Sequence, residues 1–138
     1  MSKTMLFLCT GNACRSQMAE GFAREMLPAG WQARSAGRVA AGVHPLTVEV
    51  MQEAGVDISQ QYSKTVGALP IDEIDYVVTL CGSAQEHCPV FPKAVAREHW
   101  PIEDPIAAAG DGDVRDVFRR VRDDIRRRIQ DLARRLEA

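Results

Sequence analysis

The sequence lacks the features that would bring a protein to a polyanion or into a membrane. Its 17 basic and 19 acidic residues leave a formal net charge of −2, which gives no reason to expect nucleic acid or an anionic membrane as a partner. No stretch approaches the roughly 20 apolar residues of a membrane span, and the apolar run Met5–Leu8 is too short for a signal peptide. We therefore expect a cytoplasmic protein. We also expect it to be a monomer.

Cysteine is present at only four positions, which is few for a chain stapled by disulfides. In a reducing cytoplasm these thiols point to redox chemistry or to metal binding. A zinc-binding module would draw on Cys81, His87 and Cys88, with His99 or Cys14 as a further ligand. The spacing lacks the short paired ligands of structural zinc sites, so we expect no metal.

Internal repeats are absent as well, and 138 residues suit one domain spanning 1–138. Strand and helix patterns alternate along it, which predicts an α/β fold with a four-stranded parallel sheet between helices on both faces. We expect strands near Thr4–Leu8, Gln32–Ser35, Tyr76–Thr79 and Ala94–Arg97, and helices near Ser16–Met26, Leu46–Ala54 and Val114–Glu137.

The last of these helices carries many arginines. Aspartates are interleaved with them, and apolar residues from Val114 to Leu136 recur every three or four positions. This periodicity predicts a helix packed on the sheet, not a nucleic-acid surface. Asp113 is a candidate N-cap for it.

The segment Cys9–Ser16 lies between the first expected strand and the first expected helix. A turn of this length can direct backbone N–H groups at one anion, and the positive end of the helix points to the same place. Gly11 and Asn12 can adopt the left-handed backbone angles that a cradle needs. We therefore expect the substrate-binding loop to comprise Thr10, Gly11, Asn12, Ala13, Cys14, Arg15 and Ser16.

Two side chains bracket this loop. Arg15 offers a planar fork to two oxygens of a tetrahedral oxyanion, and the positive field favours Cys9 as a thiolate nucleophile. The alternative is that Cys9 is a small buried side chain at the end of a strand. Asp104, which precedes Pro105, is a candidate general acid for the departing oxygen, and the alternative is that Asp104-Pro105 only turns the chain.

The motif Leu8–Gly21 resembles the loop of low-molecular-weight protein tyrosine phosphatases, and more closely that of the thioredoxin-coupled arsenate reductases that share their fold. The resemblance extends over nearly the whole chain and includes Ser35–Gly37, Val77–Cys81, Cys88-Pro89, His99-Trp100 and Asp104-Pro105. It implies the single-domain, three-layer fold of that family. Within the family, the pair Cys81 and Cys88 is typical of the reductases.

The resemblance implies a specific reaction. Cys9 attacks arsenate, Cys81 then attacks the Cys9 sulfur so that arsenite leaves, and exchange converts the Cys9–Cys81 disulfide into Cys81–Cys88. Thioredoxin reduces the final disulfide, and no cofactor takes part. The alternative is a tyrosine phosphatase that uses Cys9, Arg15 and Asp104 and has no task for Cys81 and Cys88.

The family also suggests residues that support the loop. Asn12, Ser16 and Ser35 match supporting positions, and Glu20 matches a residue that helps to bind potassium in some reductases. Lys64 stands where the potassium-using members carry an aspartate. Since an ammonium group repels a cation and can pair with Glu20, we expect no potassium requirement. Cys14 is either a second thiol that can react with Cys9 or a small side chain packed at the start of the helix.

Overall fold

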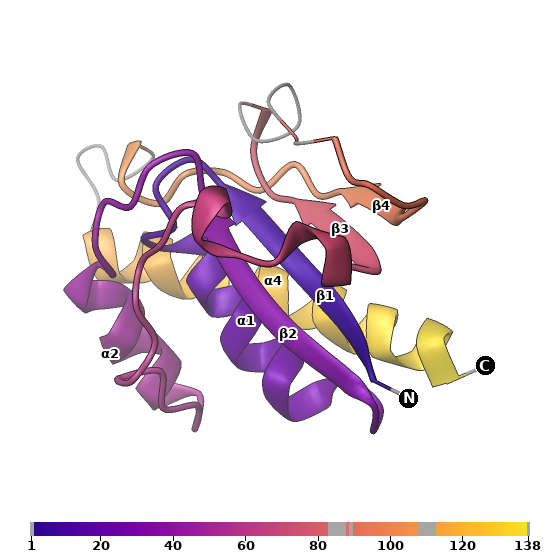
Figure 1. The fold of residues 1–138 in the computed structure, drawn as a ribbon. Coiled ribbons are helices and arrows are strands. Elements are labelled where there is room, and N and C mark those ends of the chain that lie inside the picture. Colours follow the sequence, from indigo (N-terminus) through magenta and orange to yellow (C-terminus); the bar gives the residue numbers. More distant parts are fainter. Residues whose placement is uncertain (1, 83–87, 89, 108–112, 138) are drawn as a thin grey trace.

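The computed structural model describes residues 2–82, 88, 90–107 and 113–137. In these residues the chain forms one parallel sheet whose strands are ordered β2-β1-β3-β4 (Figure 1). The strands are β1 (Lys3–Cys9), β2 (Trp31–Gly37), β3 (Tyr76–Thr79) and β4 (Ala96–His99).

Helical segments flank the sheet. In the described residues the α-helices are α1 (Arg15–Met26), α2 (Pro45–Glu53) and α4 (Val114–Glu137), and the 3-10 turns are η1 (Val66–Ala68) and η2 (Ile71–Glu73). Figure 1 shows α1 and α4 behind the sheet and the segment with η1 and η2 in front of it. The expected fold class is confirmed. Within the same residues, no helix combines the length and the apolar character that crossing a bilayer requires.

The central strand β1 explains why the sheet needs cover on both faces. Every residue of it from Thr4 to Cys9 is buried, so successive side chains enter the core on opposite sides. Because β1 lies between β2 and β3, its carboxyl end is surrounded by the ends of neighbouring strands. Ligand sites of open parallel sheets occur at this edge.

The prediction for β4 was wrong by two residues, because the strand runs from Ala96 to His99 and not from Ala94 to Arg97. Its register pairs Ala96 with Tyr76, and the Ala96 N–H donates to the Asp75 carbonyl at 3.2 Å. β4 therefore begins at the residue where hydrogen bonding to the backbone at the start of β3 begins. The other boundaries agree to within a few residues.

Helix α4 packs as its periodicity predicts. Its apolar stripe is buried, and Phe118, Ile125 and Ile129 are fully inaccessible. Side chains of this size contribute roughly 1.5–3 kcal/mol each when buried. On the exposed face Arg119 pairs with Glu53 of α2 at 2.8 Å. The Asp113 carboxylate accepts a hydrogen bond from the Arg115 N–H at 2.9 Å, as an N-cap does.

Candidate anion-binding and thiol site

A cavity of about 180 Å³ lies at the carboxyl end of β1, where the chain turns into α1. It brings together Cys9, Arg15 and Asp104, which come from β1, α1 and the segment before α4. The remaining lining residues are Thr10, Gly11, Ala13, Cys14, Ala41 and Ile106. The residues expected to bind and attack an oxyanion thus meet in one cavity.

The shape of the loop depends on Asn12. Its φ of 50° is the only positive φ among the described non-glycine residues, and its side chain is fully buried. Gly11 was expected to adopt a left-handed conformation too, and it does not. A Cβ atom on Gly11 would instead lie 3.1 Å from the Cβ of Ala41, a tight contact that favours glycine here.

Cys9 is 3% exposed, and its sulfur lies 2.8 Å from the hydroxyl oxygen of Ser16. That oxygen also accepts a hydrogen bond from Asn12 Nδ2 at 2.7 Å. Because the amide occupies one acceptor site of the hydroxyl, the Ser16 proton can be directed at the Cys9 sulfur. This arrangement suits a negatively charged sulfur, which accepts hydrogen bonds and donates none.

Arg15 and Asp104 are each held by a hydrogen bond to the backbone of the segment 102–106. The Arg15 side chain is largely buried, and its Nη1 donates to the Ile102 carbonyl at 3.1 Å. Asp104 Oδ1 accepts a hydrogen bond from the Ile106 N–H at 3.0 Å. The guanidinium is thereby tied to the segment that carries the carboxylate, so the two groups keep their places at the cavity.

Beneath the loop, the expected supporting residues form one connected network. Asn12 Nδ2 donates to the Ser35 hydroxyl at 3.0 Å, and that hydroxyl donates to Glu20 Oε1 at 2.6 Å. Lys64 Nζ lies 3.7 Å from the same carboxylate oxygen, which confirms the expected Lys64–Glu20 pairing. Burial lowers the pKa of Lys64, although the Glu20 carboxylate opposes this effect.

Gln17 is a supporting residue to which the sequence analysis gave no role. It is fully buried, and its Nε2 donates to Asn12 Oδ1 at 2.9 Å and to the Asn12 carbonyl at 3.1 Å. Gln61 Nε2 in turn donates to Gln17 Oε1 at 2.8 Å. The sequence offered one signal for this role, which is that Gln17 is a polar residue at a position facing the core.

Gly37 was quoted only as part of a motif, but the structure shows why glycine is needed there. A Cβ atom would lie 2.7 Å from the Thr10 carbonyl oxygen and 2.8 Å from the Asn12 nitrogen. Both atoms belong to the backbone of the anion loop, so they cannot move without changing the cavity. The end of β2 therefore fixes the position of the loop.

Cys14 caps the start of α1 and lines the cavity, but it is buried. Burial raises the pKa of its thiol to about 11, and a side-chain hydrogen bond with Thr47 offsets only part of this effect. At neutral pH Cys14 is therefore a protonated thiol. This favours the interpretation as a packed side chain over that as a nucleophile.

Cys81 lies beside the anion loop, as expected for a residue that follows β3. Its sulfur is 3.3 Å from the Thr10 hydroxyl oxygen, and Thr10 is the neighbour of Cys9 in the sequence. The Leu80 N–H donates to the Leu8 carbonyl at 2.9 Å, which carries the pairing of β3 with β1 up to the residue before Cys81.

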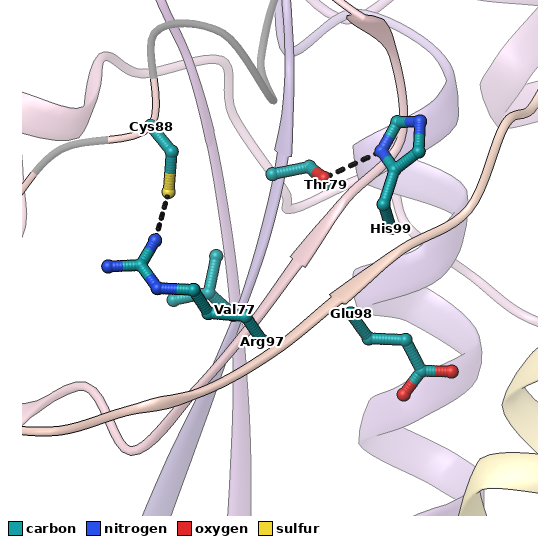
Figure 2. Close-up of a pocket in the computed structure, with 6 residues that line it drawn as sticks. All are labelled: Val77, Thr79, Cys88, Arg97, Glu98 and His99. Carbon is teal, nitrogen blue, oxygen red and sulfur yellow. Dashed lines mark hydrogen bonds between the residues drawn. The ribbon is translucent and has the colours of Figure 1, made fainter.

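Cys88 lies in a different cavity of about 280 Å³ over β3 and β4, together with Val77, Thr79, Arg97, Glu98 and His99 (Figure 2). Its sulfur accepts a hydrogen bond from Arg97 Nη1 at 2.9 Å. The described residues include all four cysteines, and no disulfide joins any of them.

The zinc hypothesis receives no support from the described ranges, in which no group of three His, Cys, Asp or Glu side chains could hold a metal ion. His99 Nδ1 instead lies 2.7 Å from the Thr79 hydroxyl oxygen. His87, the remaining histidine of that hypothesis, lies outside the described residues.

Comparisons with known proteins agree with this geometry. The model of the low molecular weight phosphotyrosine protein phosphatase family matches residues 4–138. An arsenate reductase of Shouchella clausii is 49% identical, with 96% of this chain and 97% of the relative covered. An arsenate reductase of Bacillus subtilis is 46% identical, with 96% of each chain covered.

Solved structures give the same result. A structure described as an arsenate reductase in the phosphate binding state superposes with a TM-score of 0.78 at 34% identity, covering 96% of this chain and 98% of the other. A thioredoxin-dependent arsenate reductase of Corynebacterium glutamicum superposes with a TM-score of 0.74 at 28% identity. It covers 99% of this chain, which spans 62% of that protein.

Proposed function

This chain belongs to the low molecular weight phosphotyrosine protein phosphatase family, and we propose that it is an arsenate reductase within that family. The relatives named arsenate reductase, which align over nearly their whole length, support this assignment. The observation that carries it is the position of Cys81, whose sulfur lies 3.3 Å from the hydroxyl of Thr10. A hydrolytic phosphatase has no use for a second thiol at this place.

In the first step arsenate binds in the cavity at the carboxyl end of β1. The Arg15 guanidinium and the loop N–H groups hold its oxygens, as is usual for oxyanions at the start of a helix. The Cys9 thiolate attacks arsenic, and Asp104 donates a proton to the oxygen that leaves as water. The product is a Cys9–S–As(V) adduct.

In the second step the Cys81 thiolate attacks the sulfur of Cys9. The S–As bond breaks, and arsenic leaves with the bonding pair as arsenite, so As(V) gains two electrons. The two thiolates lose those electrons and form the Cys9–Cys81 disulfide.

In the third step the Cys88 thiolate attacks the Cys81 sulfur, and Cys9 leaves as a thiolate ready for another arsenate. The Cys81–Cys88 disulfide is then reduced by an external dithiol, and we propose thioredoxin as that donor. The thioredoxin-dependent relative supports this choice. Cys88 is half-buried, whereas Cys9 is almost inaccessible, so an external protein reaches Cys88 more easily.

Replacement of Cys81 by serine tests the assignment. We expect the variant to release no arsenite when arsenate and the thioredoxin system are supplied, because the thiol that lies beside the anion loop and attacks Cys9 has been removed. Cleavage of a phosphate ester such as p-nitrophenyl phosphate depends only on Cys9, Arg15 and Asp104, and should survive. Continued turnover of arsenate by the variant would contradict the proposal.

We also propose that the enzyme needs neither a metal nor potassium, and that it works as a monomer in the cytoplasm without nucleic acid. The argument on potassium rests on Lys64, whose ammonium lies 3.7 Å from Glu20 Oε1 and 3.1 Å from the Tyr62 carbonyl. A positive charge at this place repels a monovalent cation.

A further inference from the structure

The cavity around Cys88 contains a contact that the proposed reaction does not yet use. Arg97 Nη1 donates to the Cys88 sulfur at 2.9 Å, and Figure 2 shows the two side chains directed at each other. The neighbouring Glu98 points away from them in the same view. It accepts hydrogen bonds from Tyr76 and Trp100 at 2.5 and 2.8 Å. Arg97 is therefore directed at the sulfur and not at the carboxylate beside it.

The guanidinium also contacts an aromatic ring. The Cζ atom of Arg97 lies 5.4 Å from the centroid of the Phe91 ring, within the range of a cation–π contact. Phe91 is 7% exposed and packs in the core, so it provides a fixed support. An arginine placed in this way needs little further ordering to contact the sulfur.

We propose that Arg97 is a positioning residue that stabilises the reduced form of Cys88 and so makes the Cys81–Cys88 disulfide easier to reduce. The inference rests on the proposed function, because it requires that disulfide to form. A guanidinium interacts much more favourably with the negatively charged sulfur of a thiolate than with an uncharged sulfur. Once Cys88 is bonded to Cys81, its sulfur carries no charge and is a weak acceptor.

The consequence for the redox equilibrium has a definite sign. Reduction breaks the Cys81–Cys88 bond, adds two electrons and two protons from an external dithiol, and converts that dithiol into its disulfide. An interaction made only with the reduced form shifts this equilibrium toward the two thiols. This is the effect that makes a disulfide a stronger oxidant. Arg97 thus favours the return of electrons from the donor.

The test measures the equilibrium of the Cys81–Cys88 pair in dithiothreitol redox buffers, in a Cys9→Ser background that leaves only this relay pair. Samples are quenched with acid, alkylated and analysed by peptide mass mapping. Because the contact is exposed to solvent, we expect Arg97→Met, which keeps an apolar stem on Phe91, to raise the disulfide-forming constant about fivefold, equivalent to a potential about 20 mV more negative. Arg97→Lys should give a smaller shift because it retains a positive donor.

Lys93→Met is the matched control. It removes one positive charge from the segment before β4, where Lys93 pairs with Asp75 at 2.9 Å and not with Cys88. We expect its equilibrium to stay within about twofold of the parent. Two results would overturn the inference on Arg97 without affecting the proposed relay: a Cys81–Cys88 disulfide that forms equally well in the parent and in Arg97→Met, or a shift in Lys93→Met as large as the shift in Arg97→Met. If no Cys81–Cys88 bridge forms in the parent, the proposed relay fails and takes the inference with it.

Discussion

Replacement of Asn12 by alanine is expected to destabilise the protein by about 5 kcal/mol, a large share of the stability of a domain this size. The Asn12 side chain makes four hydrogen bonds of 2.7–3.0 Å in the support of the anion loop, three of them buried and the fourth partly buried. Their partners are Ser16, Ser35, the Gln17 side chain and the Lys64 N–H.

Each of these bonds contributes about 1 kcal/mol net, because folding replaces bonds to water. Alanine adds a backbone term of about 1 kcal/mol, since a residue with φ of 50° is left-handed, where alanine is less stable than asparagine. Asn12→Gly removes the same hydrogen bonds without this backbone cost. The glycine variant is therefore expected to be about 1 kcal/mol more stable than the alanine variant.

The assay is urea unfolding of the reduced protein, compared among the parent and the two variants. A loss of less than about 2 kcal/mol in Asn12→Ala would refute the reasoning, because these four bonds would then be nearly neutral. A glycine variant no more stable than the alanine variant would refute the backbone term.

Three further predictions concern the cavity and its support. Gly37→Ala places a Cβ atom within 2.7–2.8 Å of three backbone atoms, and we expect kcat/KM to fall at least about tenfold. The control Gly67→Ala has no such contact and should keep kcat/KM within about twofold of the parent. Equal activities of the two variants would contradict the role of Gly37 in fixing the anion loop. Burial raises the pKa of Cys14 to about 11, so the alkylation rate of this thiol at pH 8 should be about 100-fold lower than that of an ordinary thiol. The rate should rise about tenfold per pH unit toward pH 11. If peptide mapping finds that Cys14 is alkylated as fast as in an unfolded control, this prediction is wrong. Replacing sodium by potassium at constant ionic strength should change activity less than about twofold, because Lys64 occupies the site beside Glu20; a several-fold activation specific to potassium would contradict the argument.

The parts of the site that follow from local sequence were predicted well. Cys9 and Arg15 lie in one cavity because a strand, a short turn and a helix follow each other directly, and the turn leaves little conformational choice. Helix α4 was placed correctly because its apolar stripe repeats over 24 residues.

The parts that depend on long-range contacts were predicted only in part. The start of β4 is set by Asp75 and Tyr76 of another strand, and no local pattern encodes that register. The support of Asn12 by Gln17 and the contact of Arg97 with Cys88 arise only when separate segments pack together. Sequence reasoning brought Cys9, Arg15 and Asp104 to one cavity, but it gave no role to Gln17 or Arg97.

The most direct test of the relay uses Cys88→Ser, which removes the last thiol and leaves Cys9 and Cys81 in place. With arsenate and no reductant, we expect one arsenite per protein molecule and a Cys9–Cys81 disulfide on peptide mapping. Arsenite release without this disulfide, or the disulfide without arsenite, would contradict the account.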